Sequence, residues 1–254
     1  MAWRAAMAER AGRPLTVAVI LCAGQGTRMG ANQNKVFLPL LGKPLLVYTI
    51  EAFQRAWTVD EIVLVAHPSE IAFCREEIVR RYGLVSVRNV LAGGASRHQS
   101  EERALEALRT RIEGGELGVV LIHDGARPFI SPEEIDALVR LVAESGNDSG
   151  ALLASAVAPD EVIARVDESG CIAGILPSRE LWRAQTPQAF AARALLAAYD
   201  AARADGFEGT DTASTFERAG HPVRILPGSP TNFKVTTPDD LLRAERIARE
   251  HSEM

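Results

Sequence analysis

The sequence predicts an α/β fold with a mostly parallel sheet, and three observations support that prediction. Short, continuous apolar runs at residues 17–22, 62–66 and 119–122 are typical of strands buried on both faces of a parallel sheet. Stretches with apolar residues at helical spacing separate these runs, which indicates repeated βαβ units. Glycine-rich segments at residues 24–30 and 93–94 each follow a predicted strand.

The first half of the chain supplies most of this alternation. Ser131, Pro132 and Glu134 form a capping box with proline at the first helical position, so a helix begins there. The predicted elements up to that point are a strand at 17–22, a turn at 37–44, a helix at 45–57, a strand at 62–66, a helix at 68–82, a strand at 84–91, a helix carrying Leu105 and Leu108, and a strand at 119–122.

The second half begins with a predicted strand at residues 151–157 and then changes character. Two short alternating runs, 162–166 and 171–176, flank the turn residues 167–170, which predicts a β-hairpin. A projecting hairpin is either an arm for a partner or an ordinary surface feature, and the pattern leaves both open. The remaining predicted elements are a helix ending near Ala204, a short helix beginning at 210–214, a strand at 223–226 and a final helix opened by Thr237 and Pro238.

Composition excludes several classes of protein. The formal net charge of −5 gives no basic surface for non-specific nucleic-acid binding, and no segment approaches the length of a membrane span. Cys22, Cys74 and Cys171 are odd in number and unclustered, as expected for reduced thiols of a cytoplasmic protein. With 47% hydrophobic residues, the chain can bury one large core, so we expect a single domain over 1–254 with a frayed start at 1–14.

The first glycine loop indicates a site for a nucleoside triphosphate. Gly24, Gly26 and Gly30 allow backbone N–H groups to approach an anion closely, and Arg28 adds a forked cation suited to phosphate oxygens. No GK[ST] follows, so the loop is not a P-loop. A dinucleotide-binding dehydrogenase needs an acid at the end of the second strand, where this chain has His67. A plain turn with a solvated arginine is the other alternative.

Three segments are predicted to meet at one edge of the sheet. Ligands of open α/β sheets bind at the carboxyl ends of the strands, where residues 24–28, 93–97 and 124–127 would converge. Mg²⁺ in such sites takes one or two carboxylates, phosphate oxygens and water, which makes Asp124 the candidate ligand. Capping of the following turn is the alternative role for Asp124.

Seven motifs extend this interpretation to nearly the whole chain. They are Ala23-Gly-x-Gly-x-Arg-Met29, Lys35, Gly93-Gly-x-x-Arg97-x-x-Ser100, His123-Asp-x-Ala-Arg-Pro128, Gln185-Thr-Pro-Gln188, Thr210-Asp211 and Asn232-x-Lys-Val-Thr236. In this order they resemble the 2-C-methyl-D-erythritol 4-phosphate cytidylyltransferase family of the non-mevalonate isoprenoid pathway. The resemblance implies a Rossmann-like sheet of nucleotidyltransferase type with a projecting hairpin arm at about 158–180.

The resemblance also implies a reaction and its partners. The expected enzyme transfers a cytidylyl group from CTP to 2-C-methyl-D-erythritol 4-phosphate, with Mg²⁺ as cofactor, in a cytoplasmic homodimer without nucleic-acid or membrane partners. A pentitol-phosphate cytidylyltransferase, such as one acting on ribitol 5-phosphate, shares most of the motifs and is an alternative. A nucleotide-binding subunit without catalysis is the alternative from another class.

Residue roles follow from the same resemblance. Arg28 and Lys35 would stabilise the pentavalent transition state, while Arg179 and Lys234 would hold the acceptor phosphate, with Arg179 contributed across the homodimer. The nucleotide side would further comprise Ala23, Gly24, Gln25, Gly26, Gly94, Arg97, Ser100, Asp124 and Arg127. The acceptor side would further comprise Thr186, Thr210 and Asp211.

One segment departs from the family pattern. The family reads Pro-Val-x-Asp-Thr-apolar-Lys where this chain has residues 156–163. Asp160 or Glu161 therefore replaces the threonine that holds the acceptor phosphate, and Val162 or Ile163 replaces the lysine. A carboxylate beside a dianionic phosphate repels it unless the carboxylate points away or binds metal. We therefore expect an intact nucleotide half and an altered acceptor half.

Overall fold

The computed structural model describes residues 12–24 and 34–252. The predictions for Gln25, Gly26 and Arg28, and for residues 1–11 of the chain start, lie outside these described residues.

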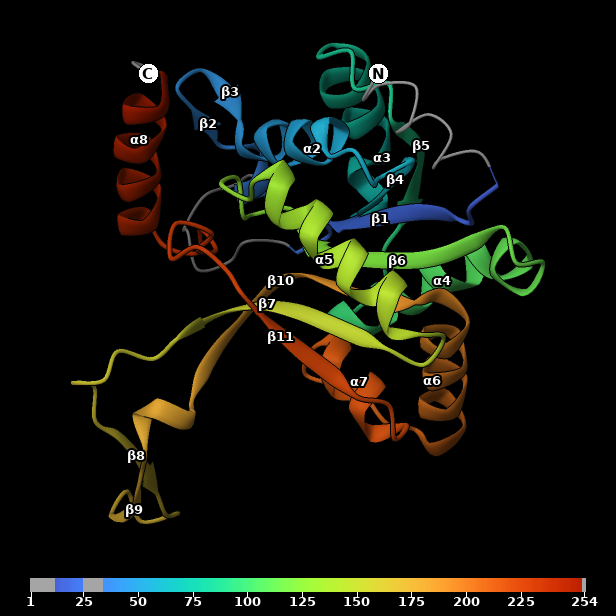
Figure 1. Ribbon diagram of the computed structural model, residues 1–254. Helices are drawn as coiled ribbons and strands as arrows, with labels where there is room; N and C mark the ends of the chain where they lie inside the picture. Colours follow the sequence, from blue (N-terminus) through green and yellow to red (C-terminus); the bar gives the residue numbers. More distant parts are fainter. Residues whose placement is uncertain (1–11, 25–33, 253–254) are drawn as a thin grey trace, which may run out of the picture.

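A seven-stranded sheet forms the centre of the structure (Figure 1). Its strands lie in the order β11-β7-β10-β6-β1-β4-β5. All neighbours are parallel except β10, which runs antiparallel to both β6 and β7, so the predicted mostly parallel sheet is confirmed. The strands are β1 (Leu15–Leu21), β4 (Glu61–Ala66), β5 (Val87–Ala92), β6 (Leu117–Asp124), β7 (Gly150–Ala156), β10 (Trp182–Ala191) and β11 (Val223–Pro227).

Strand β1 shows why continuous apolar runs predict this architecture. Successive side chains of a strand point to opposite faces, and here both faces are covered. Ala18 and Ile20 pack into the core cluster on one face, whereas Val17 and Val19 pack into the cluster on the other. All four side chains are fully buried.

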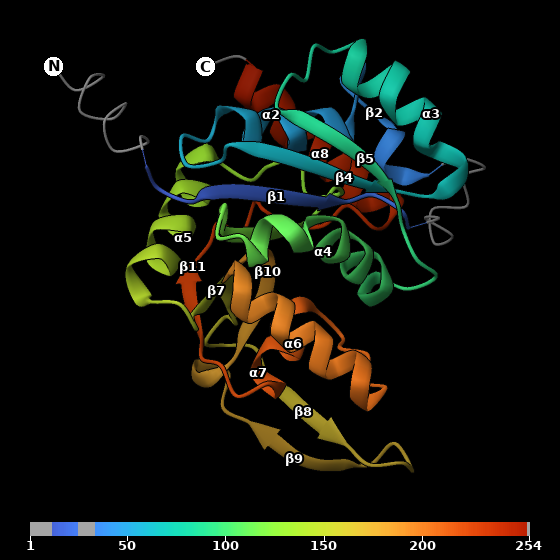
Figure 2. The same cartoon turned by 90° about the vertical axis from the view of Figure 1, so that its right-hand side faces the viewer.

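Helices cover both faces of the sheet (Figure 2). On one face lie α2 (Leu45–Arg55), α5 (Pro132–Ser145) and the helical segment η3 (Pro68–Glu70), α3 (Ile71–Phe73) and η4 (Cys74–Arg80), whose last part is π-helical. On the other lie α4 (Arg97–Glu113), α6 (Ala192–Asp205) and α7 (Thr212–Arg218). The last helix, α8 (Pro238–Ser252), packs beside the short pair β2 (Pro39–Leu40) and β3 (Lys43–Pro44), which follows η2 (Lys35–Phe37).

The predicted helix starts agree with the observed caps. The Ser131 side chain accepts from the backbone N–H of Glu134, whose carboxylate accepts from the backbone N–H of Ser131, as a capping box requires. Thr237 accepts from the backbone N–H of Asp240 at the start of α8. The sequence did not predict β10, because Pro187 argues against a central strand. The register of β10 against β7 shifts between Ala184 and Gln188, and this irregularity accommodates the proline.

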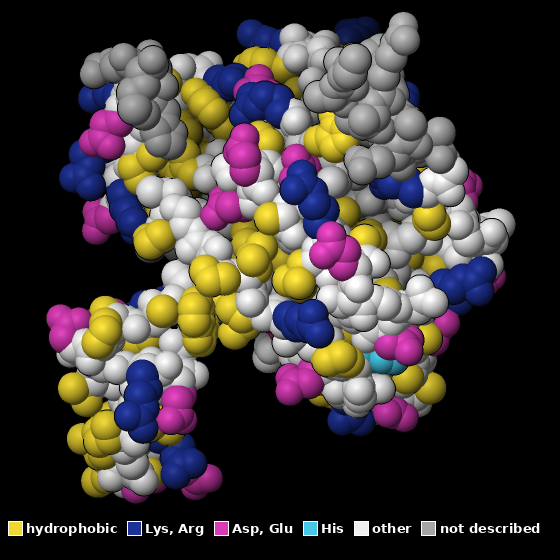
Figure 3. All heavy atoms as spheres, viewed as in Figure 1, with side chains coloured by type: hydrophobic (Ala, Val, Ile, Leu, Met, Phe, Trp, Pro, Cys, Tyr) yellow, Lys and Arg dark blue, Asp and Glu magenta, His cyan; other side chains and the backbone are white. Residues whose placement is uncertain are grey.

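The predicted hairpin is confirmed and projects away from the sheet and helices (Figures 1 and 2). It consists of β8 (Ile163–Val166) and β9 (Ile172–Leu176), and η5 (Ser178–Glu180) leads back to β10. We call residues 158–180 the arm. Val162 and Ile172 are 75% and 68% exposed, and hydrophobic side chains gather along one side of the arm (Figure 3). Among the described residues, the structure contains no helix long and apolar enough to cross a membrane.

Candidate active site

A cavity of about 330 Å³ opens at the carboxyl ends of β1, β5 and β6, where the sequence predicted three segments to meet. Parts of all three predicted segments line it, which confirms their convergence within the described residues. The lining residues are Leu21, Cys22, Ala23, Gly24, Lys35, Val36, Gly94, Ala95, Ser96, Arg97, Ser100, Asp124, Gly125, Ala126, Lys234 and Thr236.

The second glycine loop is held closely against the first helix that follows it. A Cβ on Gly94 would lie 2.4 Å from Cβ of Gln99, so only glycine fits there. Ser100 accepts from the backbone N–H of Gly94 at 3.0 Å and donates to the carbonyl oxygen of Ser96 at 2.9 Å. Ser96 caps α4 by accepting from the backbone N–H of Gln99. The positive end of α4 therefore faces the cavity and favours an anion there.

Asp124 is the last residue of β6 and lies among three cations. Its carboxylate oxygens are 3.0 Å from Nζ of Lys234, 3.5 Å from Nε of Arg127 and 3.6 Å from Nε of Arg97. Burial alone would raise the pKa of Asp124, but Lys234, Arg97 and Arg127 together hold it well below its usual range. Three cations around one carboxylate leave an excess of positive charge at the cavity wall.

The segment after β11 attaches Lys234 beside β6. The backbone N–H of Val235 donates to the carbonyl oxygen of Ala126 at 2.9 Å, and Nη1 of Arg127 donates to the carbonyl oxygen of Asn232 at 2.8 Å. Nδ2 of Asn232 donates in turn to the carbonyl oxygen of Thr186. Arg127 thus anchors this segment and contacts Asp124, although it does not line the cavity.

Thr186 and His123 lie behind Asp124 rather than in the cavity. The backbone N–H of Asp124 donates to Oγ1 of Thr186 at 3.0 Å, and the Thr186 hydroxyl lies 3.0 Å from Nδ1 of His123. Burial lowers the pKa of His123 to about 3, so its ring is neutral at physiological pH. Thr186 therefore fixes the end of β6, and its hydroxyl is already engaged within the protein.

The other predicted acceptor-side residues lie away from the cavity of this chain. Asp211 caps α7 by accepting from the backbone N–H of Ser214 at 2.9 Å, and Thr210 before it is exposed. Arg179 is exposed on the arm and lies 3.6 Å from Glu180. Neither Arg179, Thr210 nor Asp211 lines the cavity.

The altered segment does not place a carboxylate in the cavity. Asp160 is exposed, and Glu161 forms an ion pair with Arg183 of β10. Within one chain the Glu161 carboxylate is therefore paired with Arg183, and neither Asp160 nor Glu161 lines the cavity of that chain.

The donor set of the cavity fits a metal only together with a substrate. Among the described residues, no group of three or more His, Cys, Asp or Glu side chains is arranged to hold a metal ion. Asp124 supplies one carboxylate, and Mg²⁺ commonly binds through one or two carboxylates plus substrate phosphates and water. Asp124 is thus suited to a metal that arrives with a triphosphate.

Some cavity residues have no role predicted for them from the sequence. Ser96 carries a recognisable signal, because Ser96-x-x-Gln99 is a capping-box pattern at a helix start. Thr236 closes the motif that contains Lys234, whereas Cys22, at the end of a predicted strand, carries no comparable signal. Glu101, four residues after Arg97 on α4, contacts Arg97 in the structure and is itself 1% exposed. An acid four residues from an arginine is a recognisable helix pair, but its burial is not visible in the sequence.

Comparisons with known proteins agree with this geometry. The family model described as IspD: 2-C-methyl-D-erythritol 4-phosphate cytidylyltransferase matches residues 16–250. A relative of that name from Geobacter metallireducens is 45% identical over 234 residues, which cover 92% of this chain and 97% of the relative. The relative of that name from Clostridium acetobutylicum is 39% identical, over 94% of this chain and 99% of its own length.

Solved structures share the fold. The 4-diphosphocytidyl-2C-methyl-D-erythritol synthase from Anaerococcus prevotii superposes with a TM-score of 0.78 at 26% identity, covering 93% of this chain and 96% of that protein. The 2-C-methyl-D-erythritol 4-phosphate cytidylyltransferase from Thermus thermophilus gives a TM-score of 0.70 at 30% identity, over 91% and 98% of the two chains. The seven-stranded sheet is therefore of the nucleotidyltransferase type that the sequence predicts.

Proposed function

This chain belongs to the 2-C-methyl-D-erythritol 4-phosphate cytidylyltransferase family, and on that premise we propose that the cavity beside Asp124 is its active site. The enzyme transfers a cytidylyl group from CTP to 2-C-methyl-D-erythritol 4-phosphate, giving 4-diphosphocytidyl-2-C-methyl-D-erythritol and pyrophosphate in isoprenoid biosynthesis. The observation that carries the assignment of the site is the cluster of Lys234, Arg97 and Arg127 around Asp124, in the cavity that Gly24 and Gly94 also line.

The transfer requires no covalent bond between the protein and its substrates. A phosphate oxygen of the acceptor attacks the α-phosphorus of CTP, a new P–O bond forms, and the bond to pyrophosphate breaks with its electron pair. Binding groups and charge then decide the rate. The N-terminus of α4, which lies beside Gly24 and Gly94 in the cavity wall, favours the nucleotide's anionic groups. Lys35 lines the same cavity, and we assign Arg28 and Lys35 to the charge that develops on the transferring and leaving phosphates.

Mg²⁺ is the cofactor we propose, with Asp124 as its protein ligand. When bound, the ion supplies neutralisation of phosphate charge in the transition state. The low pKa of Asp124 supports this role, because a ligand carboxylate must be ionised. Without the ion, Lys234 pairs with the Asp124 carboxylate at 3.0 Å.

The acceptor half is proposed to form between two copies of the chain. Lys234 lines the cavity, but Arg179 lies on the exposed arm, outside the cavity of its own chain. The exposed hydrophobic side chains of the arm, including Val162 and Ile172, support a second copy as the surface that covers it.

We also propose a cytoplasmic location, because Cys22, Cys74 and Cys171 are free thiols.

Complementation between two inactive variants tests the shared site. Arg179→Ala and Lys234→Ala are each expected to lose most turnover, measured as pyrophosphate release from CTP and Mg²⁺ with 2-C-methyl-D-erythritol 4-phosphate. If Arg179 acts across the dimer, a heterodimer of the two variants contains one site with both wild-type residues. Co-expressed, differently tagged subunits then regain close to half of the wild-type activity per heterodimer. Activity no greater than that of either variant would show that both residues act within one chain.

The acceptor is tested in the same assay. Turnover with 2-C-methyl-D-erythritol 4-phosphate is compared with turnover on ribitol 5-phosphate and with a reaction that contains no acceptor. We expect clear preference for the first acceptor, in keeping with the ion pair in which Arg183 neutralises the Glu161 carboxylate. Preference for the pentitol phosphate would overturn the choice of acceptor.

A further inference from the structure

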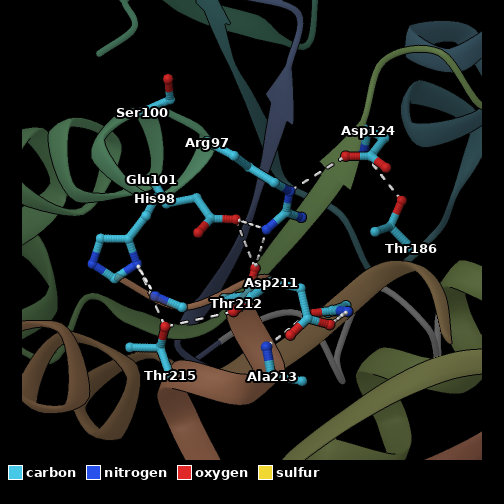
Figure 4. A network of polar contacts seen from close by, with 12 residues as sticks. Arg97, His98, Ser100, Glu101, Asp124, Thr186, Asp211, Thr212, Ala213 and Thr215 are labelled. Carbon is cyan, nitrogen blue, oxygen red and sulfur yellow. Dashed lines mark hydrogen bonds and ion pairs between the residues drawn. The ribbon is translucent and has the colours of Figure 1, made fainter. Parts of the chain in front are cut away.

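A buried charged cluster lies immediately behind the cavity wall (Figure 4). Glu101 is one helical turn after Arg97 on α4, and its carboxylate accepts from Nη1 of Arg97. The Thr212 hydroxyl of α7 donates to the same carboxylate at 2.8 Å, and the Tyr199 hydroxyl of α6 donates to it as well. Three helices thus converge on one carboxylate that is 1% exposed.

Arg97 contacts two carboxylates, Glu101 and Asp124. Nη1 of Arg97 contacts Glu101 and lies 3.3 Å from Oγ1 of Thr212, whereas Nε lies 3.6 Å from Asp124 (Figure 4). Arg97 also lines the cavity. The guanidinium therefore bridges a buried carboxylate and the carboxylate at the catalytic edge.

Burial of the Glu101 carboxylate lowers the free energy of unfolding unless its hydrogen-bond partners compensate for the lost water. Burying a carboxylate costs free energy that a single ion pair seldom returns, and apolar side chains often serve stability as well or better. Here the hydroxyls of Tyr199 and Thr212 and the guanidinium of Arg97 satisfy Glu101 from three sides. Such an arrangement fixes the direction in which the arginine points.

We propose that Glu101 is a positioning residue for nucleotide binding, which acts by holding Arg97 at the cavity wall. Without Glu101, Asp124 is the only carboxylate within ion-pair distance of Arg97 among the described residues. The guanidinium would then turn onto Asp124, which withdraws Arg97 from the triphosphate, while Thr186 still fixes the end of β6 that carries Asp124. This inference rests on the proposed nucleotide role of Arg97.

The test compares Glu101→Gln with a matched control on the same helix. Glu102→Gln removes the neighbouring carboxylate, which lies 3.9 Å from Arg203 and does not line the cavity. We expect Glu101→Gln to raise both the KM and the calorimetric Kd for CTP about tenfold, with kcat changed less than threefold. Glu102→Gln should change neither constant.

A double-mutant cycle separates positioning from general stability. If Glu101 acts through Arg97, Glu101→Gln adds nothing to the loss of CTP affinity in Arg97→Ala. Additive losses, or an unchanged Kd in Glu101→Gln, would overturn the inference while leaving the site assignment intact. An unchanged Kd in Arg97→Ala would instead overturn the nucleotide role of Arg97 and the inference with it.

A second variant guards against misfolding of the first. Thr212→Val keeps the shape of the side chain and removes the hydroxyl that donates to Glu101 and accepts from Nη1 of Arg97. It should raise the Kd for CTP by a smaller factor, about threefold, and this effect should also vanish in the Arg97→Ala background. A Thr212→Val enzyme with wild-type CTP affinity would contradict the positioning role.

Discussion

Asp124→Asn offers a sharp test of the charge arrangement in the cavity. The substitution keeps the size of the side chain and removes one negative charge from the centre of Lys234, Arg127 and Arg97. These cations lie 3.0, 3.5 and 3.6 Å from the carboxylate. In the variant Lys234 and Arg127 lose this carboxylate and Arg97 keeps only Glu101, so the protein without nucleotide is destabilised.

The size of the effect follows from the burial of the carboxylate, which is 8% exposed. Removing one partner of a buried ion pair typically costs about 3 to 5 kcal/mol. The cavity side is open to water, so we take the lower figure, about 3 kcal/mol. For a chain of this size that corresponds to a decrease in Tm of about 6 to 12 °C.

The nucleotide should reverse part of this loss. In the presence of a chelator, the phosphates of CTP bring anionic oxygens to the three cations that Asp124 otherwise occupies. CTP should therefore raise the Tm of Asp124→Asn by more than it raises the Tm of the wild type. Added Mg²⁺ should raise the Tm of the wild type further, but not that of the variant, if Asp124 is the metal ligand.

Thermal unfolding followed by circular dichroism measures each protein without nucleotide, with CTP and a chelator, and with CTP and Mg²⁺. Pyrophosphate release measures the accompanying loss of turnover, about a hundredfold or more. Asp148→Asn, an exposed carboxylate after α5, is the matched control and should change nothing. Equal Tm values for Asp124→Asn and the wild type, with equal shifts on CTP addition, would refute the view that this carboxylate holds the cations.

Further predictions concern the transition state, protonation and assembly. Arg28→Ala and Lys35→Ala should each lower kcat by about a hundredfold to a thousandfold with modest change in the Kd for CTP, and near-normal turnover of either would remove its catalytic role. The pKa of His123 falls from 6.5 in the unfolded chain to about 3 in the folded protein. As pH falls from about 6.5 to 3, the unfolded state takes up a proton that the native state does not, so stability is lost. Wild type should therefore lose about 1.4 kcal/mol per pH unit relative to His123→Asn in denaturant unfolding, and parallel pH curves would contradict this. Ile172→Asp on the arm should shift the mass measured by light scattering from dimer to monomer, and an unchanged mass would argue against the arm as the dimer contact.

Much of the fold was predictable because the core pattern is local. Strand β1 shows its burial in consecutive apolar residues, and the capping box at Ser131 shows its helix start in four residues. That Asp124, Gly24 and Gly94 line one cavity follows from the rule that parallel strands present their carboxyl ends at one edge. The position of the cavity is therefore predictable from the sequence.

The parts that escaped prediction depend on distant partners. Pro187 argues against a strand until the register shift of β10 is known. Glu101 reads as a solvated helix charge, because Tyr199 and Thr212, which bury and satisfy it, follow 98 and 111 residues later. The polar role of Thr186 is likewise invisible locally, since it serves the backbone of Asp124 on another strand.

The arm has a consequence for how the protein responds to dilution. Among the described strands, β8 and β9 pair only with each other, and a two-stranded ladder is marginally stable by itself in water. Its amide hydrogens in a lone chain should exchange quickly, and the turn at residues 167–170 should be open to proteases. Where a second copy covers the arm, mass action opposes that opening. Exchange rates in the arm should therefore fall as protein concentration rises, while those of β1 and β6 stay constant.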